Sequence, residues 1–201
     1  LGYYEMPEKT KITIKEGTAT IEDKAFADCA QLIDIVIPES VKDIGDSAFS
    51  NCSNLTSITF PSGLTNIGEY AFDNCIKLSN IKIPDSVTKI GQYAFRGCTG
   101  LSDVTIGNGV KNLNGFEFEN GYDYSNLTKI TIGNGVESIK EKAFSECKNL
   151  SDITIGTGII SVGKDNSYGH PKQVILDRLN KIDIYSNNKN FRLHDKFIPY
   201  N

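Results

Sequence analysis

The sequence predicts a repeat solenoid, in which short coils stack along one axis around a continuous core. The main observation is a unit of 23 residues that recurs almost unchanged from Ile21, Ile44, Ile67 and Ile90. A fixed period of this length is typical of solenoids, where each repeat supplies one coil and covers its neighbours. Most units also contain Leu-x-x-Ile-x-Ile, the two-residue alternation of a strand with one buried face. Because these strands run the same way in successive coils, we expect a parallel sheet along one side.

Each unit opens with an aliphatic residue and continues with an Ala-Phe pair and a cysteine, as at Ala48-Phe49 and Cys52. In the first unit the stretch from Asp23 to Cys29 is only seven residues long, and helices that short are marginal on their own. We therefore expect single turns of α- or 3₁₀-helix on the outer side. A proline or a glycine then ends each strand where the coil has to turn. The other cysteines at the repeated position are Cys29, Cys75, Cys98 and Cys147.

Two coils depart from the unit. The fifth runs from Leu113 to Ser138 and is 26 residues long. Counted from its first residue, the Ala-Phe position reads Glu117-Phe118 and the cysteine position is Gly121. The seventh opens at Val162 and has neither an Ala-Phe pair nor a cysteine. The extra segment of the fifth coil carries three further aromatic residues: Phe116, Tyr122 and Tyr124.

An uninterrupted repeat predicts one domain over residues 1–201, because a solenoid core has no natural boundary. Residues 1–20 are expected to form an N-terminal cap and a partial coil. Residues 21–161 hold six coils, five of 23 residues and one of 26. Residues 162–201 are expected to form an irregular last coil and a C-terminal cap. Terminal repeats are atypical in solenoids because one of their faces has no neighbouring coil.

The composition excludes several classes of partner. Apolar residues make up 39% of the chain and charged residues 23%, which is ordinary for a globular domain. The net charge of −4 provides no basic field, so we expect neither nucleic acid nor an anionic membrane surface as a partner. No apolar run reaches the roughly 20 residues that a transmembrane helix needs. The first residues also lack the pattern of a signal peptide.

The unit L-x-x-I-x-I-P-x-x-V-x-x-I-G-x-x-A-F-x-x-C resembles the BspA-like leucine-rich repeats of bacterial and some protozoan surface proteins. The resemblance covers roughly the stretch from Lys11 to Ile184. It implies a curved, right-handed solenoid with its parallel sheet on the concave face and short strands or helical turns on the convex face. Members of this family are typically secreted or anchored at the cell surface, and some are adhesins for host matrix proteins.

The residue types that carry chemistry favour no enzyme. Each cysteine occupies a repeated position, so we interpret the five as buried free thiols that fill the core. Their odd number and in-register directions argue against a full set of disulfides, and a straight ladder does not offer zinc a tetrahedral site. The two histidines, His170 and His194, lie in the irregular C-terminal region and are interpreted as loop or cap residues. We therefore predict no catalytic, cofactor or metal site.

The exposed side of the repeated strands is the first candidate binding surface. Solenoids use their concave sheets for extended contacts, although threonine also suits an exposed strand position without any ligand. Both interpretations stay open. The candidate residues on this face are Thr59, Lys82, Thr105, Thr131, Thr154, Asp103, Lys129 and Asp152.

The aromatic insertion of the fifth coil is the second candidate. Exposed tyrosines are favoured at interfaces, and insertions in repeat proteins often map to a binding face. The alternative is that Phe116, Tyr122 and Tyr124 cover the gap left by the missing alanine and cysteine. Both interpretations stay open here too. The irregular stretch from Gly163 to Gln173 is another place where function is expected, because the unit fails there.

Together these observations predict a non-enzymatic, secreted or cell-surface interaction module. It is expected to bind protein, such as host extracellular matrix or another surface protein, or glycan. Binding would use the concave sheet face and the inserted loop. The alternative is a structural spacer within a larger surface protein, with no ligand of its own. An enzyme is the third hypothesis, and it lacks a supporting cluster of histidine, cysteine or carboxylate side chains.

Overall fold

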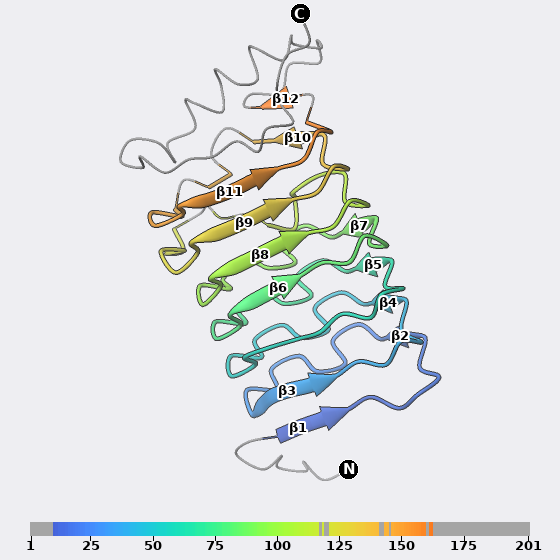
Figure 1. The fold of residues 1–201 in the computed structure, drawn as a ribbon. Helices are drawn as coiled ribbons and strands as arrows, with labels where there is room; N and C mark the ends of the chain where they lie inside the picture. Colours follow the sequence, from blue (N-terminus) through green and yellow to red (C-terminus); the bar gives the residue numbers. More distant parts are fainter. Residues whose placement is uncertain are drawn as a thin grey trace, which may run out of the picture.

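The computed structural model describes residues 10–116, 118, 121–140, 143–144, 146–159 and 161–162. Over these residues the chain forms a parallel β-solenoid, in which successive coils stack along one axis (Figure 1). The predicted solenoid is therefore confirmed. No helix in the described part of the chain is long and apolar enough to cross a membrane. The predicted C-terminal cap, Gly163 to Gln173 and both histidines lie outside the described residues.

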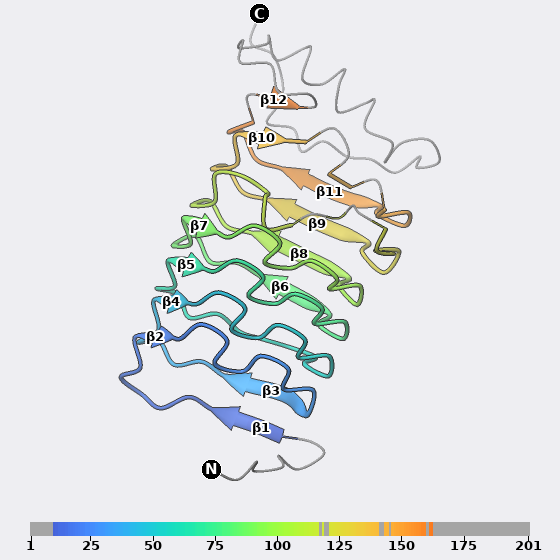
Figure 2. The same ribbon diagram turned by 180° about the vertical axis from the view of Figure 1, so that it is seen from behind.

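The longer strands form one column of the solenoid, which we call the long-strand sheet (Figures 1 and 2). All of its pairs are parallel, in the groups β1–β3 and β6–β8–β9–β11. Their core-facing residues alternate with outward-facing ones, as the Leu-x-x-Ile-x-Ile pattern predicts. The strands are β1 Thr10–Thr13, β3 Leu32–Val36, β6 Asn80–Lys82, β8 Asp103–Ile106, β9 Lys129–Ile132 and β11 Asp152–Ile155.

The second coil departs from this sheet. A strand was expected here as in the other coils, but residues 57–60 form none. Ile58 and Phe60 nevertheless keep their side chains buried, at 8% and 7% exposure. Phe60 stands where the other coils have isoleucine or a similar aliphatic residue. Its larger ring packs edge-on against Phe72, with centroids 5.6 Å apart. The long-strand sheet is consequently interrupted between β3 and β6.

Short parallel strands form a second column (Figures 1 and 2). Each begins one residue before the aliphatic residue that opens a coil, and from β2 to β10 that residue is buried in the core. The ladder is continuous through the first four coils and is then reduced at the fifth coil to an isolated bridge between Asn112 and Ser138. The strands are β2 Thr20–Ile21, β4 Asp43–Ile44, β5 Asn66–Ile67, β7 Lys89–Ile90, β10 Ser138–Ile139 and β12 Ser161–Val162.

The expected helical turns on the outer side are wrong for the described residues, which contain no helix. The outer segments, which run from each short strand to the cysteine, consist of tight turns instead. Residues such as Ser47 and Asn51 have positive φ values of 54° and 60°, which stop helix propagation. Backbone N–H groups of these outer segments donate hydrogen bonds to carbonyls of the next coil, as Phe49 N–H does to the Ala71 carbonyl at 2.7 Å. The outer side is thus held by hydrogen bonds along the solenoid axis.

The core consists of ladders of equivalent side chains. The phenylalanines of the Ala-Phe pairs stack almost parallel, with centroids 5.2 Å apart for Phe26–Phe49 and 5.1 Å for Phe49–Phe72. The leucines and isoleucines of the strands form further buried rows. Because each ring covers the next, burial is nearly complete from the second coil onward, where Phe49 is 0% exposed. This packing fixes both sheets and leaves only side chains that point outward for contacts with other molecules.

Candidate functional site

The exposed side of β6, β8, β9 and β11 brings most of the predicted sheet-face residues together. Backbone pairing places Lys82 beside Thr105, which lies beside Thr131 and then Thr154. A second row on the same strands joins Asn80, Asp103, Lys129 and Asp152 in register. Thr59 is also exposed, but it belongs to the interrupted second coil and is not paired in this sheet.

The charges on this face are sparse and solvated. Lys129 and Asp152 form a 4.0 Å ion pair whose side chains are both about half exposed. Exposed pairs of this kind contribute little to stability, so both charges can be redirected toward a ligand at low cost. Lys82 is exposed at the end of the threonine row. The face therefore offers hydroxyl groups flanked by mobile charges of both signs.

A shallow hollow of about 240 Å³ lies at the C-terminal ends of β9 and β11. Two of the predicted residues, Thr131 and Thr154, contribute to its wall. It has no charged lining, and its polar groups are hydroxyls, amides and backbone. The remaining lining residues were not predicted: Asn108, Ile132, Gly133, Asn134, Ile155, Gly156 and Thr157.

The asparagines of the hollow are held by a ladder between coils. Asn134 N–H donates to Asn108 Oδ1 at 2.8 Å, and Thr157 N–H donates to Asn134 Oδ1 at 3.0 Å. Gly133 permits this close stacking, because a Cβ there would lie 2.6 Å from the Gly107 backbone. The Gly-Asn-Gly triplets at 107–109 and 133–135 are the sequence signal for this rigid rim. Their position at strand ends identifies them as turns, but does not reveal the hollow.

The aromatic insertion needs correction. Phe116 and Tyr124 are buried, at 2% and 1% exposure, and Tyr122 is half-buried against the core. Phe95 N–H donates to the Gly115 carbonyl, as Phe72 N–H donates to Ala94. Gly115-Phe116 is therefore the Ala-Phe position, and the assignment to Glu117-Phe118 was wrong. The interpretation that the rings cover a gap in the core describes Phe116 and Tyr124, so these two offer no exposed binding surface.

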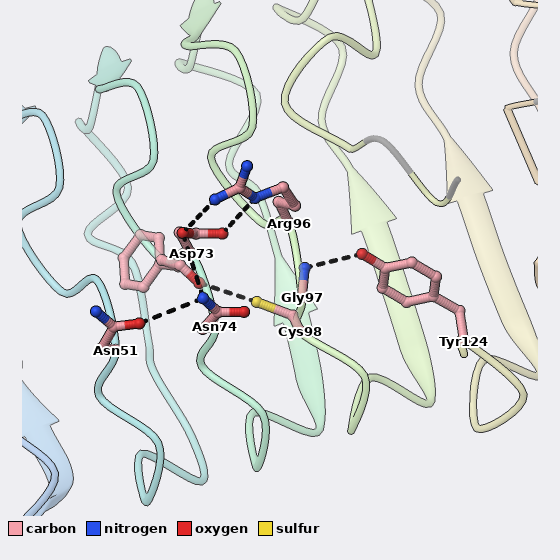
Figure 3. A network of polar contacts seen from close by, with 8 residues as sticks. Asn51, Asp73, Asn74, Arg96, Gly97, Cys98 and Tyr124 are labelled. Carbon is pink, nitrogen blue, oxygen red and sulfur yellow. Dashed lines mark hydrogen bonds and ion pairs between the residues drawn. The ribbon is translucent and has the colours of Figure 1, made fainter. Parts of the chain in front are cut away.

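Tyr124 occupies the cysteine position of the fifth coil, which had been assigned to Gly121. Leu127 N–H donates to the Tyr124 carbonyl at 3.0 Å, as Leu101 N–H donates to the Cys98 carbonyl at 3.2 Å. The Tyr124 hydroxyl accepts a 2.9 Å hydrogen bond from Gly97 N–H (Figure 3). In the first three coils, the N–H group equivalent to that of Gly97 donates instead to a backbone carbonyl of the following coil. Burial raises the pKa of the Tyr124 hydroxyl above its ordinary value.

The described cysteines are free thiols, as the repeat predicts. Cys52 Sγ donates to the Phe26 carbonyl at 3.1 Å, and Cys98 Sγ donates to Phe72 at the same distance. Burial raises the pKa of Cys52 and raises that of Cys147 to about 12. Thiols that stay protonated at neutral pH are poor nucleophiles. This ladder is a packing element.

On the outer side, a buried carboxylate of the third coil, Asp73, pairs with Arg96 of the fourth coil (Figure 3). Arg96 donates from Nε and Nη2 to the two carboxylate oxygens of Asp73, both at 2.8 Å. Asp73 is only 6% exposed, so the paired arginine compensates its burial. These hydrogen bonds raise the pKa of Arg96 above its ordinary value. Among the described residues, no cluster of three histidine, cysteine or acidic side chains is arranged to hold a metal ion.

Comparison with protein families gives a match over most of the chain. The BspA type leucine-rich repeat region, in six copies, matches residues 19–123 and 119–197. No curated protein sequence matches the chain. A solved leucine-rich repeat protein of T. pallidum is 27% identical, with a TM-score of 0.67. The match covers 91% of this chain and 86% of that protein.

Two longer proteins are also similar. The pneumococcal vaccine antigen PcpA is 17% identical with a TM-score of 0.55, over 78% of this chain and 42% of that one, and shows the fold alone. A leucine-rich cell surface protein of Faecalibacterium prausnitzii is 25% identical with a TM-score of 0.43. That match covers 76% of this chain and 50% of the other. The chain thus spans about half or less of these two proteins.

Proposed function

Because this chain belongs to the BspA type leucine-rich repeat family, we propose that it is a non-enzymatic interaction module of the bacterial surface or secreted fraction. Leucine-rich repeat proteins are generally binding or scaffold modules, and proteins of this type are typically bacterial surface or secreted proteins. The module binds protein or glycan through the exposed side of β6, β8, β9 and β11, which is concave in the curved solenoid that the family resemblance implies.

The observation that carries this proposal is the unbroken register of the four strands across the irregular fifth coil. β8 pairs with β9 from Asp103 opposite Lys129 to Ile106 opposite Ile132, although the two coils differ in length. The insertion is accommodated elsewhere, so the outward side chains remain a continuous surface. The hydroxyls of Thr105, Thr131 and Thr154 form no hydrogen bonds with other described residues, and are available to a ligand.

The mechanism is many weak contacts made by a scaffold that needs little reordering. Ordering of side chains and loops is a main cost of association. Here the strands are fixed by a buried core, and the rim of the hollow is fixed by the Asn108–Asn134–Thr157 ladder. Threonine also loses few rotamers on binding, because its χ1 angle is already restricted. The sheet therefore offers preformed donors and acceptors to an extended partner.

The test uses the whole chain against a panel of purified extracellular matrix proteins and a glycan array. The double variant Thr131→Arg, Thr154→Arg fills the hollow, and Thr88→Arg changes an exposed threonine beside the short strand β7 as the matched control. We expect the double variant to lose at least about tenfold in affinity, as for central interface residues, and the control to bind like wild type. Equal binding by both variants would contradict the proposal. Failure to bind any panel member would favour the spacer instead.

A further inference from the structure

A second surface lies on the outer side, away from the long-strand sheet. We call it the outer aromatic patch and define it as Tyr70, Tyr93, Arg96 and Tyr122. The Tyr70 and Tyr93 rings stack with centroids 5.2 Å apart and planes inclined by 26°. The Arg96 guanidinium carbon lies 5.0 Å and 5.3 Å from those centroids. Tyr122 closes one end, since its Cε1 lies 3.2 Å from the place of a Cβ on Gly97.

The two stacked tyrosines occupy a backbone position that does not suit them. Tyr70 and Tyr93 have φ values of 54° and 59°, a region that bulky side chains rarely adopt. The equivalent residues of the first two coils, Lys24 and Ser47, have the same conformation. The fold therefore requires positive φ here, but it does not require tyrosine. Both rings are only half-buried and make no part of the continuous core, so core packing does not explain them.

Arg96 is held rigidly within this patch. Two of its nitrogens are bound to the buried carboxylate of Asp73, and its guanidinium carbon lies within cation–π distance of both tyrosine rings. Nη1 donates no hydrogen bond to any described residue and is left to bind an acceptor from outside. Tyrosine and arginine are the residue types most enriched at interface hot spots, where rigid, partly buried side chains anchor a partner. The arrangement has this character before any partner binds.

An acidic ladder of Asp23, Asp46 and Glu69 occupies the first three coils and reaches the patch at Glu69, the residue before Tyr70. Asp46 N–H donates to Asp23 Oδ1 at 2.8 Å, and Glu69 N–H donates to Asp46 Oδ1 at 2.7 Å. All three side chains are exposed. A glycine precedes both Asp46 and Glu69 and lets successive coils approach closely. A Cβ on Gly68 would lie only 2.6 Å from Asp46 N. The rigid aromatic patch is thus bordered by a row of carboxylates with fixed spacing.

We propose that the outer aromatic patch and this acidic ladder form a docking surface for an extended, basic segment of a partner protein. Lysine or arginine side chains of the partner pair with Asp46 and Glu69. The partner backbone accepts hydrogen bonds from Arg96 Nη1 and the tyrosine hydroxyls. The faces that Tyr70 and Tyr93 turn to each other are closed to a sugar, whereas the ring edges and hydroxyls suit a peptide. This surface is separate from the long-strand sheet, so it stands or falls independently of the proposed function.

The experiment measures binding of a fluorescent peptide of alternating lysine and proline, which stays extended. The matched peptide carries glutamine in place of lysine. The double variant Tyr70→Asn, Tyr93→Asn removes the rings while keeping a residue type that tolerates positive φ. Ser47→Asn places the same side chain at the equivalent position of the second coil and is the control. Circular dichroism and thermal unfolding verify that each variant folds.

We expect wild type and Ser47→Asn to bind the lysine peptide equally and the tyrosine double variant to bind at least about tenfold more weakly. Glu69→Gln should also weaken binding, most clearly at low salt. The glutamine peptide should bind poorly to every form. Thr131→Arg, Thr154→Arg should leave peptide binding unchanged, which separates this surface from the sheet face. Equal binding by wild type and the tyrosine variant, or no binding by wild type, would overturn the proposal.

Discussion

The fourth and fifth coils fill the outer half of the same core in different ways. In the fourth, Phe95 and Cys98 do so within the regular unit, and the thiol bonds to the carbonyl of Phe72. In the fifth, three aromatic rings take over: Phe116, Phe118 and Tyr124. Phe116 continues the phenylalanine ladder at 4.6 Å from Phe95, and Phe118 lies 5.9 Å from Phe144 of the sixth coil. The fifth coil thus contributes two rings to the phenylalanine ladder, Phe116 and Phe118, where a regular coil contributes one.

The difference shows which part of a coil tolerates a change in length. The long-strand sheet keeps its register across the fifth coil, whereas the short-strand column is reduced to one bridge there. Strand register is strongly specified when one face is buried, because a slip of one residue exposes the core side chains. The outer segments are turns, which accept insertions more easily. The extra residues therefore collect on the outer side, and the sheet face keeps its register from β6 to β11.

The largest expected effect comes from breaking the regular ladder. Phe72→Ala removes a fully buried ring that stacks on both neighbours at 5.1 Å and 5.2 Å and also contacts Phe60. We expect a loss of about 3–5 kcal/mol in the free energy of unfolding. Phe118→Ala should cost less, because Phe116 and Phe144 lie 5.9 Å away and only Tyr124 is closer, edge-on at 5.1 Å. Urea denaturation measures both values, and a larger loss at Phe118 would contradict the comparison.

The next effect is specific to the fifth coil. Tyr124→Phe keeps the ring but leaves the buried N–H of Gly97 without its acceptor. An unsatisfied buried donor costs about 1–3 kcal/mol, so this variant should be clearly destabilised. Tyr122→Phe is the control, because its hydroxyl forms no hydrogen bond with a described residue, and it should change stability little. Hydrogen exchange at the Gly97 amide should accelerate only in the first variant. Equal exchange in both would show that the hydroxyl does not replace the missing carbonyl.

The sequence located the repeated core positions of the regular coils but misplaced two of them in the irregular fifth coil, for a physical reason. Counting forward from Leu113 assigned the cysteine position to Gly121, whereas counting back from Leu127 gives Tyr124. The second count is right because the strand is fixed by pairing with its neighbours, while the outer segment absorbs the insertion. Aromatic content alone did not distinguish exposed rings from rings that restore lost core volume. Phe116 and Tyr124 would form a binding site only if their rings were exposed, and both are buried.

The outer turns and the hollow could not be predicted from a single repeat, because both depend on contacts between coils. The run of seven residues from Asp23 to Cys29 reads equally well as a helical turn. In the structure its N–H groups bond to the next coil, which depends on positive φ at Lys24 and Asp28. The position of Asp28 is taken by asparagine or glycine in the next three coils. These residue types tolerate positive φ, and this signal was overlooked. The sheet-face threonines were predicted correctly as outward residues, because two-residue alternation fixes which side they face. The hollow arises between two coils, and no single unit encodes it.

Alkaline pH should distinguish the thiol of the sixth coil from the tyrosine of the fifth. Burial raises the pKa of Cys147 from 9.0 to about 12, so the unfolded chain loses this proton first as pH rises. Stability therefore falls between about pH 9 and pH 12, by about 1.4 kcal/mol per pH unit for this thiol. The pKa of Tyr124 is also raised, but from 10.0, so its contribution starts one unit higher.

The two variants that test this are Cys147→Ala and Tyr124→Phe. Urea midpoints measured from pH 8 to pH 11 should show a shallower loss in the cysteine variant from about pH 9 upward. In the tyrosine variant the slope should change only from about pH 10 upward. The buried groups of the remaining coils contribute equally in both and set the common background. An unchanged slope in Cys147→Ala would mean that its thiol titrates in the folded state as it does in the unfolded chain.

The smallest effect is expected at the exposed end of the insertion. Asp123 accepts hydrogen bonds from the backbone and side chain of Ser125, and its ion pair with Lys148 is long, at 3.9 Å. The Ser125 hydrogen bonds are the main cause that lowers the pKa of Asp123, and Lys148 is a minor one. Lys148→Ala should therefore leave both the thermal midpoint and that pKa nearly unchanged, whereas Ser125→Ala should raise the pKa. NMR titration of Asp123 in the two variants measures this. A larger shift in Lys148→Ala would show that the sixth coil, and not the local turn, holds the insertion in place.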